Sequence, residues 1–224
     1  MLFIKRLFLL FLLVPSLLFA KGYDEDYDYG AGIKLAVNTD FYQLEPVVGW
    51  RINKSFHINC GLRFQAGYRG APSINASDYA WDIDDENKKI FHFFITPSLQ
   101  YKLCLVERKK EGSTGYVNLS VEPGMLFQPF AFDAFYFVRN RFSDTMPMES
   151  RKINNFRWLD LFFYFQAGLE YIVDDGSFFI GYEISNQDIY IDRRNVVVEN
   201  IPLNDFLPKR ELCHSIFIGI RVFL

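Results

Sequence analysis

The side chains in this chain best suited to acid–base chemistry are two histidines and three oxygen-bearing groups. His57, His92, Ser98, Glu122 and Asp160 all fall on the polar side of segments whose polarity alternates residue by residue. Imidazole and carboxylate groups can move protons to and from a substrate. No nucleophile stands at a recognisable spacing from a base, and histidines in a charged interior are commonly structural. An outer-membrane enzyme, such as a lipid-modifying or proteolytic barrel, is therefore the least favoured of three functional hypotheses, and we expect no catalytic residue.

The same polar faces carry charges of both signs, interleaved with glycines. Long side chains of opposite charge can pair across a narrow interior, where an unpaired charge would be costly. We therefore expect a salt-bridge network inside the fold rather than a binding site. Its predicted members are Lys34, Glu45, Arg51, His57, Arg63, His92, Lys102, Glu122, Asp160, Glu170, Glu183 and Arg221.

The sequence contains no metal-ligand spacing, phosphate-binding glycine motif or nucleotide fingerprint, so we expect no cofactor. The three cysteines, Cys60, Cys104 and Cys213, are an odd number for an exported chain. The alternation predicts that Cys60 faces outward and that the other two face inward from opposite sides. We therefore expect buried, free thiols rather than a disulfide.

These polar residues must be positioned by β-strands, because the alternation has a period of two. It is clearest from Phe56 to Tyr68, where apolar and polar residues alternate. Soluble strands usually span about five or six residues, whereas a tilted strand across a bilayer needs roughly 9–11. Similar strands are predicted at 29–38, 43–52, 56–68, 90–106, 116–128, 157–173, 178–186 and 212–224.

Eight amphipathic strands predict an all-β, eight-stranded antiparallel up-and-down transmembrane barrel. The connections after the second, fourth and sixth strands are short, including a turn at 53–55 and a polar turn at 107–115. Those after the third, fifth and seventh strands are long loops, at 69–89, 129–156 and 187–211. Short turns on one side and long loops on the other are typical of the outer membrane, with both termini in the periplasm.

The alternative fold is a soluble, lipocalin-like barrel with its apolar face inside. The alternation of polar and apolar residues does not distinguish a soluble barrel from a membrane barrel, but the size of the apolar side chains does. The apolar face is crowded with Phe, Leu, Ile and Tyr on every strand, which is bulkier than an eight-stranded interior easily holds. The chain contains 25 Phe and 13 Tyr, yet its mean hydropathy is only +0.01. This combination favours a surface that meets lipid around a polar lumen.

The N-terminus resembles a secretory signal peptide at 1–20, with basic Lys5 and Arg6, an apolar run from Leu7 to Phe19 and a cleavage site between Ala20 and Lys21. An acidic leader at 21–28 and the barrel domain at 29–224 would follow. Removing Lys5 and Arg6 leaves 22 basic against 27 acidic residues, a net charge of −5. No basic stripe indicates nucleic-acid binding, and no later apolar run is long enough for a membrane-spanning helix.

Three prolines fall within predicted strands on the outward side, at Pro46, Pro97 and Pro123. Proline has no N–H to donate to a β-ladder, so we expect local bulges or broken pairing at each.

The pattern resembles the Bacteroidetes-type outer-membrane β-barrel domain, the PorT-like group, over essentially residues 21–224. The resemblance rests on the signal peptide, the eight strands, the terminal strand Ile216 to Leu224 and the steps Glu45-Pro46, Thr96-Pro97 and Glu122-Pro123-Gly124. It implies location in the outer membrane of a Gram-negative cell envelope, and it implies fold better than activity.

The leading hypothesis is a small closed barrel with a structural, surface-interaction or secretion-accessory role and no general porin activity, because an eight-stranded interior is filled by side chains. The second is binding or passage of a small amphipathic molecule, suggested by the Phe-rich start of loop 129–156. Expected partners are outer-membrane lipid, periplasmic chaperones and the barrel-assembly machinery. A secretion or surface partner would contact the three long loops.

Overall fold

The computed structural model describes most of the chain from Asp28 onward. The described residues are 28–53, 55–67, 74–75, 79–83, 91–110, 113–130, 134–140, 149–153, 158–173, 175–194, 197–198, 201–205 and 207–224. The predicted signal peptide and all of the acidic leader except Asp28 lie outside these ranges, so both stay predictions.

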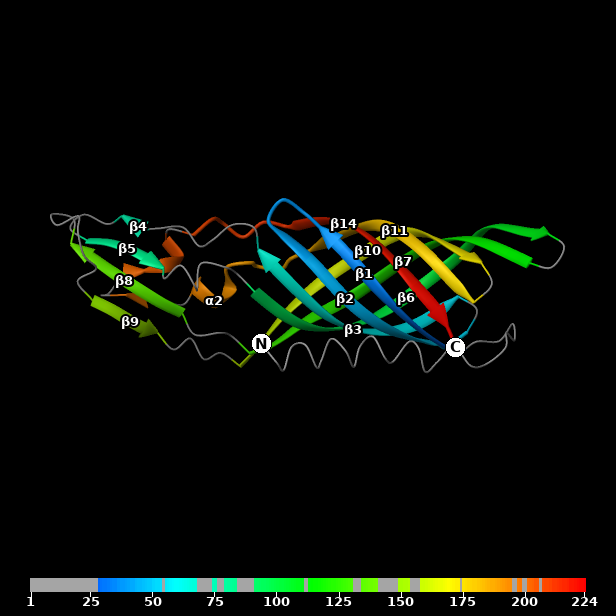
Figure 1. Cartoon of the computed structure of the whole chain (residues 1–224), viewed down its shortest axis with the longest axis horizontal. Coiled ribbons are helices and arrows are strands. Elements are labelled where there is room, and N and C mark those ends of the chain that lie inside the picture. Colours follow the sequence, from blue (N-terminus) through cyan, green and yellow to red (C-terminus); the bar gives the residue numbers. More distant parts are fainter. Residues whose placement is uncertain are drawn as a thin grey trace, which may run out of the picture.

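Eight long strands form one closed antiparallel barrel, which confirms the predicted fold class (Figure 1). The barrel closes because β1 pairs with β2 on one side and with β14 on the other, in a register that sets Gly30 opposite Phe223. The strands, in chain order, are β1 (Tyr29–Val37), β2 (Phe41–Arg51), β3 (Phe56–Gly67), β6 (Phe91–Lys110), β7 (Ser113–Phe130), β10 (Trp158–Val173), β11 (Gly176–Ser185) and β14 (Cys213–Phe223).

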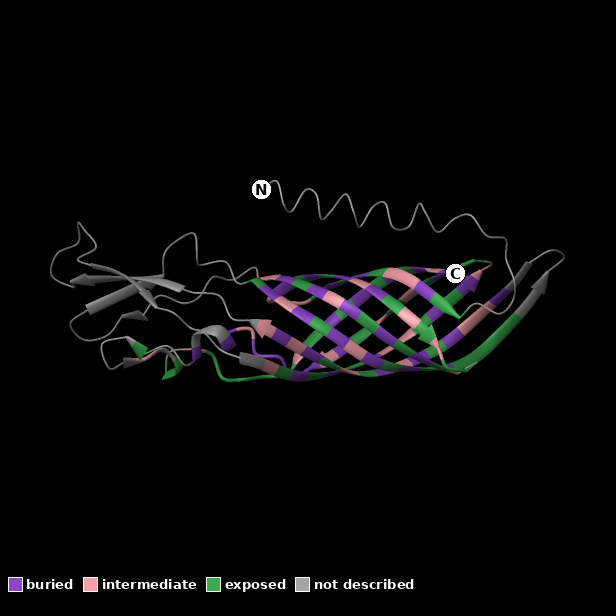
Figure 2. Ribbon diagram, turned by 90° about the horizontal axis from the view of Figure 1, so that it is seen from below, coloured by how far each residue is buried: buried purple, intermediate pink, exposed green. Residues whose placement is uncertain are grey.

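The apolar side of the strands faces outward, so the soluble, lipocalin-like alternative is wrong. In β1, Lys34 is buried between the exposed residues Ile33 and Leu35. The same alternation of buried and exposed residues crosses every barrel strand in Figure 2. A closed barrel pairs its backbone groups within the wall, and an apolar exterior suits lipid. The fold is that of a transmembrane β-barrel.

Aromatic side chains gather near both rims of the barrel wall. Near one rim the rings of Tyr29 and Trp50 lie 5.5 Å apart, and those of Phe56 and Tyr101 lie 5.0 Å apart. Near the other rim, the rings of Phe64 on β3 and Phe93 on β6 lie 5.2 Å apart. Aromatic belts of this kind mark the two interfaces between membrane and water.

The two ends of the barrel differ in their connections. At the entry end, where the chain enters β1 and leaves β14, the turn before β3 is held by Asn53, whose side-chain oxygen accepts from the N–H groups of Ser55 and Phe56. At the opposite end, here called the loop end, the short β1–β2 turn is held in the same way by Asn38. All three long connections also lie at the loop end (Figure 1).

The long connections contain more structure than the sequence predicts. Segments of the first two pair as a second, four-stranded sheet in the order β4-β5-β8-β9. Its central pair joins residues far apart in the chain, with Tyr79 opposite Asn140, and local alternation does not reveal such pairing. The additional elements are β4 (Ile74–Asn75), β5 (Tyr79–Ile83), β8 (Ala134–Asn140), β9 (Glu149–Ile153), α2 (Ile191–Arg194), β12 (Val197–Val198), β13 (Ile201–Pro202) and η2 (Leu203–Asp205).

The predicted polar turn at 107–115 is wrong, because β6 and β7 continue as a ladder until Lys110 lies opposite Ser113. The resulting hairpin projects beyond the entry end of the barrel (Figure 1). The register shifts by one residue between Cys104 and Val106, which places a β-bulge at the base of the hairpin.

The predicted effect of the prolines is correct only for broken pairing. The β2–β3 ladder skips Pro46, and the β6–β7 ladder skips Pro97 and Pro123. No register shift accompanies any of the three. The bulge near Cys104 therefore arises where the hairpin leaves the barrel wall, not at a proline.

Two of the three predictions of cysteine burial are wrong. Cys60 is exposed on the outer wall, as its predicted orientation requires, and Cys104 is exposed because it lies where the hairpin leaves the barrel. Cys213 is half-buried and donates to the Gln187 carbonyl at 3.2 Å. All three thiols are free. Within the described ranges, no helix is long and apolar enough to cross a membrane.

Candidate functional site

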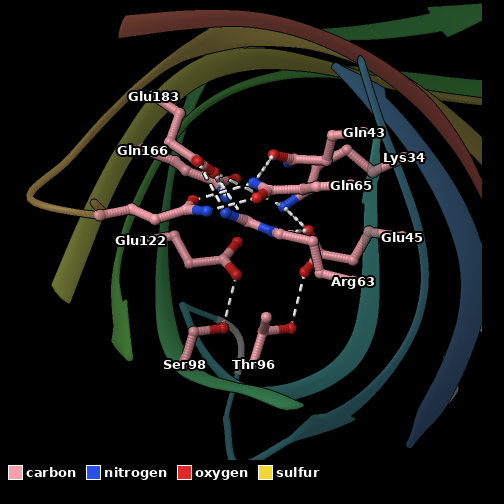
Figure 3. A network of polar contacts seen from close by, with 11 residues as sticks. Lys34, Gln43, Glu45, Arg63, Gln65, Thr96, Ser98, Glu122, Gln166 and Glu183 are labelled. Carbon is pink, nitrogen blue, oxygen red and sulfur yellow. Dashed lines mark hydrogen bonds and ion pairs between the residues drawn. The ribbon is translucent and has the colours of Figure 1, made fainter. Parts of the chain in front are cut away.

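The lumen is filled at mid-height by a charge network centred on Arg63, whose side chain is fully buried. Arg63 Nε donates to Glu45 Oε2 at 2.8 Å. Its two terminal nitrogens donate to the two carboxylate oxygens of Glu183 at 2.8 and 2.7 Å. Lys34 Nζ lies 2.8 Å from Glu45 Oε2, and the Thr96 hydroxyl donates to Glu45 Oε1 at 2.7 Å. Figure 3 shows these side chains meeting in the middle of the lumen.

A second charge network lies nearer the entry end. Lys102 Nζ is 2.6 Å from Glu170 Oε2, while the hydroxyl of Ser177 donates to Glu170 Oε1 at 2.8 Å. Arg221 Nη1 lies 3.8 Å from Glu170 Oε1 and donates to Gln100 at 3.1 Å. With Glu122, which lies in neither network, the buried cationic and acidic residues of the described strands are equal in number: Lys34, Arg63, Lys102 and Arg221 against Glu45, Glu122, Glu170 and Glu183.

A small cavity separates the two networks. Its volume is about 20 Å³, which is room for about one water molecule. Glu122 on its wall accepts from the Ser98 hydroxyl at 2.5 Å. The full lining is Lys34, Val47, Gln100, Ser120, Glu122, Gln166, Phe179, Phe217 and Arg221. A space of this size does not form a channel.

The loop end of the lumen is closed by the segment Gln187–Arg194, here called the plug. The side-chain amides of Gln187 and Gln65 bond to each other, and the N–H of His92 Nε2 donates to the Ile189 carbonyl at 2.9 Å. Asp188 accepts from Arg194 and from the backbone N–H of Tyr190. The plug is therefore tied both to the barrel wall and to itself.

An apolar cluster seats the plug in the barrel mouth. Ile191 of α2 is buried against four side chains that point into the lumen from the strands: Phe94, Leu126, Phe162 and Tyr164. The sequence prediction placed Tyr164 on the inward face of its strand but did not name Phe94, Leu126 or Phe162. The sequence does carry a signal for such apolar lumen residues, which is a local loss of the polar–apolar alternation. Phe94 and Phe162 each stand inside runs that are apolar on both faces. Such a run indicates an interior that changes from polar to apolar toward the loop end.

The predicted network residues fall into groups along the barrel rather than into one site. Lys34, Glu45, Arg63 and Glu183 form the central network, and Lys102, Glu170 and Arg221 form the entry network. His57 is buried beside the entry network and lines a small space with the half-buried Arg51. Glu122 faces the central cavity, His92 holds the plug, and Asp160 is half-buried on β10 opposite Gln128.

The five candidate acid–base residues do not form one site, although Ser98 and Glu122 are hydrogen-bonded to each other. His57 lies opposite Gln100 in the β3–β6 ladder, and His92 lies eight residues before Gln100 in β6. Eight residues of strand correspond to roughly 26 Å. Ser98 bonds to Glu122 and lies opposite Asn59 in the ladder, two residues along β3 from His57 and six along β6 from His92. Among the described residues, no group of three His, Cys, Asp or Glu side chains could hold a metal ion.

Lumen glycines leave room for the large side chains of neighbouring strands. A Cβ added at Gly124 would lie 2.3 Å from the ring of Tyr164, and one at Gly219 would lie 2.2 Å from the ring of Phe179. The Tyr164 ring in turn lies 4.9 Å from the guanidinium carbon of Arg63. Glycine at these positions lets aromatic rings pack flat against the inner wall beneath the charge network.

No family model matches the chain, and no curated protein is similar to it in sequence. Among solved structures it is similar to Neisserial surface protein A (NspA), with a TM-score of 0.37, 11% identity, and coverage of 88% of this chain and 94% of that one. It is also similar to Ail, the attachment invasion locus protein of Yersinia pestis, with a TM-score of 0.32, 10% identity, and coverage of 87% and 93%. The resemblance to the PorT-like group therefore stays a prediction.

Proposed function

We propose that this protein is a closed barrel of the Gram-negative outer membrane, and that it acts through its loop end rather than by transport. One observation carries the proposal: a fully buried arginine bridges Glu45 and Glu183 in the middle of the lumen. A salt bridge at this position obstructs the lumen at mid-height. The signal-like N-terminus and the lipid-facing wall support the location.

General porin activity does not fit a lumen of this kind. The central cavity has room for about one water molecule, and the plug covers the loop end. Capture of an amphipathic molecule within the lumen is also disfavoured, because the cavity has room for only about one water molecule and the apolar cluster is already occupied by Ile191. The function is therefore proposed for the surface outside the wall.

The loop end offers a built surface for contacts. The sheet β4-β5-β8-β9 lies beyond the barrel mouth (Figure 1), next to the plug and its connection to β14. Binding residues concentrate on loops held by rigid scaffolds. A surface-interaction or structural role fits this arrangement, and the PorT-like resemblance adds a secretion-accessory role as one form of it.

Liposome swelling tests the closed lumen. Proteoliposomes containing the wild-type barrel should swell in small sugars no faster than empty liposomes. A variant lacking residues 188–194 and carrying Arg63→Ala and Glu183→Ala provides the matched opened barrel. Rapid swelling with the wild-type protein would contradict the proposal.

Surface labelling tests the location and orientation. An epitope inserted between β8 and β9 should bind antibody on intact cells, and the same epitope placed after Leu224 should bind only in permeabilised cells. The reverse pattern, or labelling of both sites only after permeabilisation, would overturn the proposed orientation. Crosslinking from the accessible insertion site on intact cells would then identify a surface or secretion partner.

A further inference from the structure

A small pocket lies beside the entry network, at the entry end of the lumen. Its volume is about 10 Å³, which is room for about one water-sized particle. Gly30 and Gly49 on its wall lie directly opposite each other in the β1–β2 ladder, so neither strand has a side chain there to fill the space. The full lining is Asp28, Tyr29, Gly30, Gly49, Arg51, His57, Arg221 and Phe223.

Two buried polar atoms on the pocket wall lack a partner. The side chains that carry them, His57 and Arg221, belong to residues that are each only 6% exposed. Arg221 Nη1 donates to Gln100, but Arg221 Nε and His57 Nδ1 have no hydrogen-bond partner among the described residues. Buried polar groups are nearly always hydrogen-bonded, because an unpaired one is costly. A particle in the pocket that contacts both atoms would satisfy them.

The charges deep in the pocket are mostly positive. Glu170 is the acid of the entry network, and two cations share it, since it lies 2.6 Å from Lys102 Nζ and 3.8 Å from Arg221 Nη1. The strongest charges that act on the His57 ring come from Lys102, Arg221, Glu170 and Arg51. Three cations therefore act there against one acid.

The other nearby acids do not remove this excess. Asp28 is the acid on the pocket lining, but it is exposed at the entry rim, where water and salt screen its charge. Glu122 faces the central cavity and bonds to Ser98. A cleft with a positive field concentrates anions, so the pocket favours an anion over a neutral water molecule.

We propose that this pocket binds a small monovalent anion of the halide class, such as chloride, between Arg221 Nε and His57 Nδ1. Both atoms donate to the anion, so His57 is the neutral tautomer with its proton on Nδ1. Hydrogen bonds to an ion are stronger than those between neutral groups. The anion gives Arg221 a second counter-charge, and the pocket is too small for phosphate or a carboxylate ligand. The site does not depend on the lumen being closed or on the role of the loop end.

Bromide tests the site crystallographically, because it resembles chloride and scatters anomalously. Crystals of the full chain grown in sodium bromide should show an anomalous peak within hydrogen-bond distance of Arg221 Nε and His57 Nδ1. Density at this position without an anomalous signal would identify a water molecule and overturn the proposal. Anomalous peaks at other positions only would also overturn it.

Unfolding at constant ionic strength tests binding in solution and separates a true site from an adventitious ion only. The urea midpoint for loss of heat-modifiable mobility is measured while sodium bromide replaces sodium gluconate, whose anion is too large for the pocket. A ligand that binds only the folded state raises stability with the logarithm of its concentration once the site is filled. The wild-type midpoint should rise in this way relative to that of a variant with a filled pocket.

Gly30→Ala is that variant, because it fills the pocket without changing any charge. Its added Cβ would lie 3.0 Å from Arg221 Cδ and 3.4 Å from the ring of Phe223. Gly115→Ala, whose Cβ would meet only ordinary contacts at 3.4 Å and beyond, is the matched control and should respond to bromide as the wild type does. Equal bromide dependence in the wild type and Gly30→Ala would overturn the proposal.

His57→Phe tests the site independently of the glycine. It keeps a neutral ring but removes the Nδ1 donor, so the bromide affinity derived from the midpoints should fall by about tenfold, as expected for the loss of one hydrogen bond to an ion. The exposed loop-end variant Lys209→Gln should keep the wild-type affinity. An affinity unchanged by His57→Phe would overturn the proposed site.

Discussion

Arg63 and Glu183 face each other from strands on opposite sides of the barrel. In the closed order β1-β14-β11-β10-β7-β6-β3-β2, three strands separate β3 from β11 in either direction. The two bonds between their side chains, 2.8 and 2.7 Å long, therefore span the lumen. Arg221 and Gln100 repeat the arrangement, since β14 and β6 are also opposite. These bonds across the lumen therefore connect strands that are not paired by backbone hydrogen bonds.

Removing the central arginine should strongly destabilise the barrel. Arg63→Ala leaves the buried Glu45 and Glu183 with Lys34 as their shared cation, 2.8 and 4.0 Å away, and breaking a buried pair costs about 3–5 kcal/mol. The urea midpoint for loss of heat-modifiable mobility should fall accordingly. Lys209→Ala, at an exposed position, should not change it. An unchanged midpoint for Arg63→Ala would show that the network does not stabilise the fold.

Removing both partners should cost less than the two single changes suggest. In Arg63→Met with Glu183→Gln, the uncompensated charge at position 183 is absent, so the loss of unfolding free energy should be smaller than the sum of the single losses. The measurement is a double-mutant cycle by urea titration. Simple additivity would argue against direct coupling of the two side chains.

Alanine at Gly124 should destabilise the barrel through a clash with Tyr164. The added Cβ would lie 2.3 Å from the ring, and overpacking of this kind costs about 1–3 kcal/mol. Gly115→Ala is the matched control, because its Cβ would meet only ordinary contacts at 3.4 Å and beyond. Adding Tyr164→Ala should relieve part of the cost of Gly124→Ala. Equal stability of the two glycine variants would contradict the packing seen at Tyr164.

Loosening the plug should expose its connection to protease without unfolding the barrel. Asp188→Ala removes the acceptor for Arg194, Arg210 and the Tyr190 N–H, so cleavage by trypsin after Arg194 should become faster. Asp205→Ala, at an exposed position of the same connection, should cleave at the wild-type rate. Unchanged protection in Asp188→Ala would mean that the apolar cluster alone holds the plug.

A charge on the outer wall should oppose membrane insertion according to depth. Ile218→Arg, near the middle of β14, should cost about 2–4 kcal/mol in the folding equilibrium with lipid vesicles, while Ile52→Arg at the entry rim should cost about 0–1 kcal/mol. Similar costs at both positions would argue that the wall does not face hydrocarbon.

Much of the barrel could be predicted from the sequence because alternation has a period that only strands share. Arg63 and its companions were placed inside the lumen by phase alone. Their individual partners could not be predicted, because the meeting of Arg63 with Glu183 depends on the closure that brings β3 and β11 face to face. The sheet β4-β5-β8-β9 could not be predicted either, because it forms by pairing between two connections that are far apart in the sequence.

The remaining errors share a local cause. Polarity was taken to mark the end of a strand, yet β6 continues through Arg108–Lys110 because a hairpin outside the lipid needs no apolar face. Cys104 was assigned to the lumen by the same alternation, which loses its meaning where the strand leaves the barrel wall. The plug was unforeseen since Ile191 stands in a polar, irregular stretch without a period of its own.

Single-channel recording in planar lipid bilayers tests the closed lumen most directly. The salt bridge between Arg63 and Glu183, the cavity with room for about one water molecule, and the seated plug together predict that the inserted wild-type barrel shows no stable conducting steps. The variant without residues 188–194 and with Arg63→Ala and Glu183→Ala should conduct if it folds and inserts. Regular steps from the wild-type protein, like those of a water-filled porin, would contradict the account.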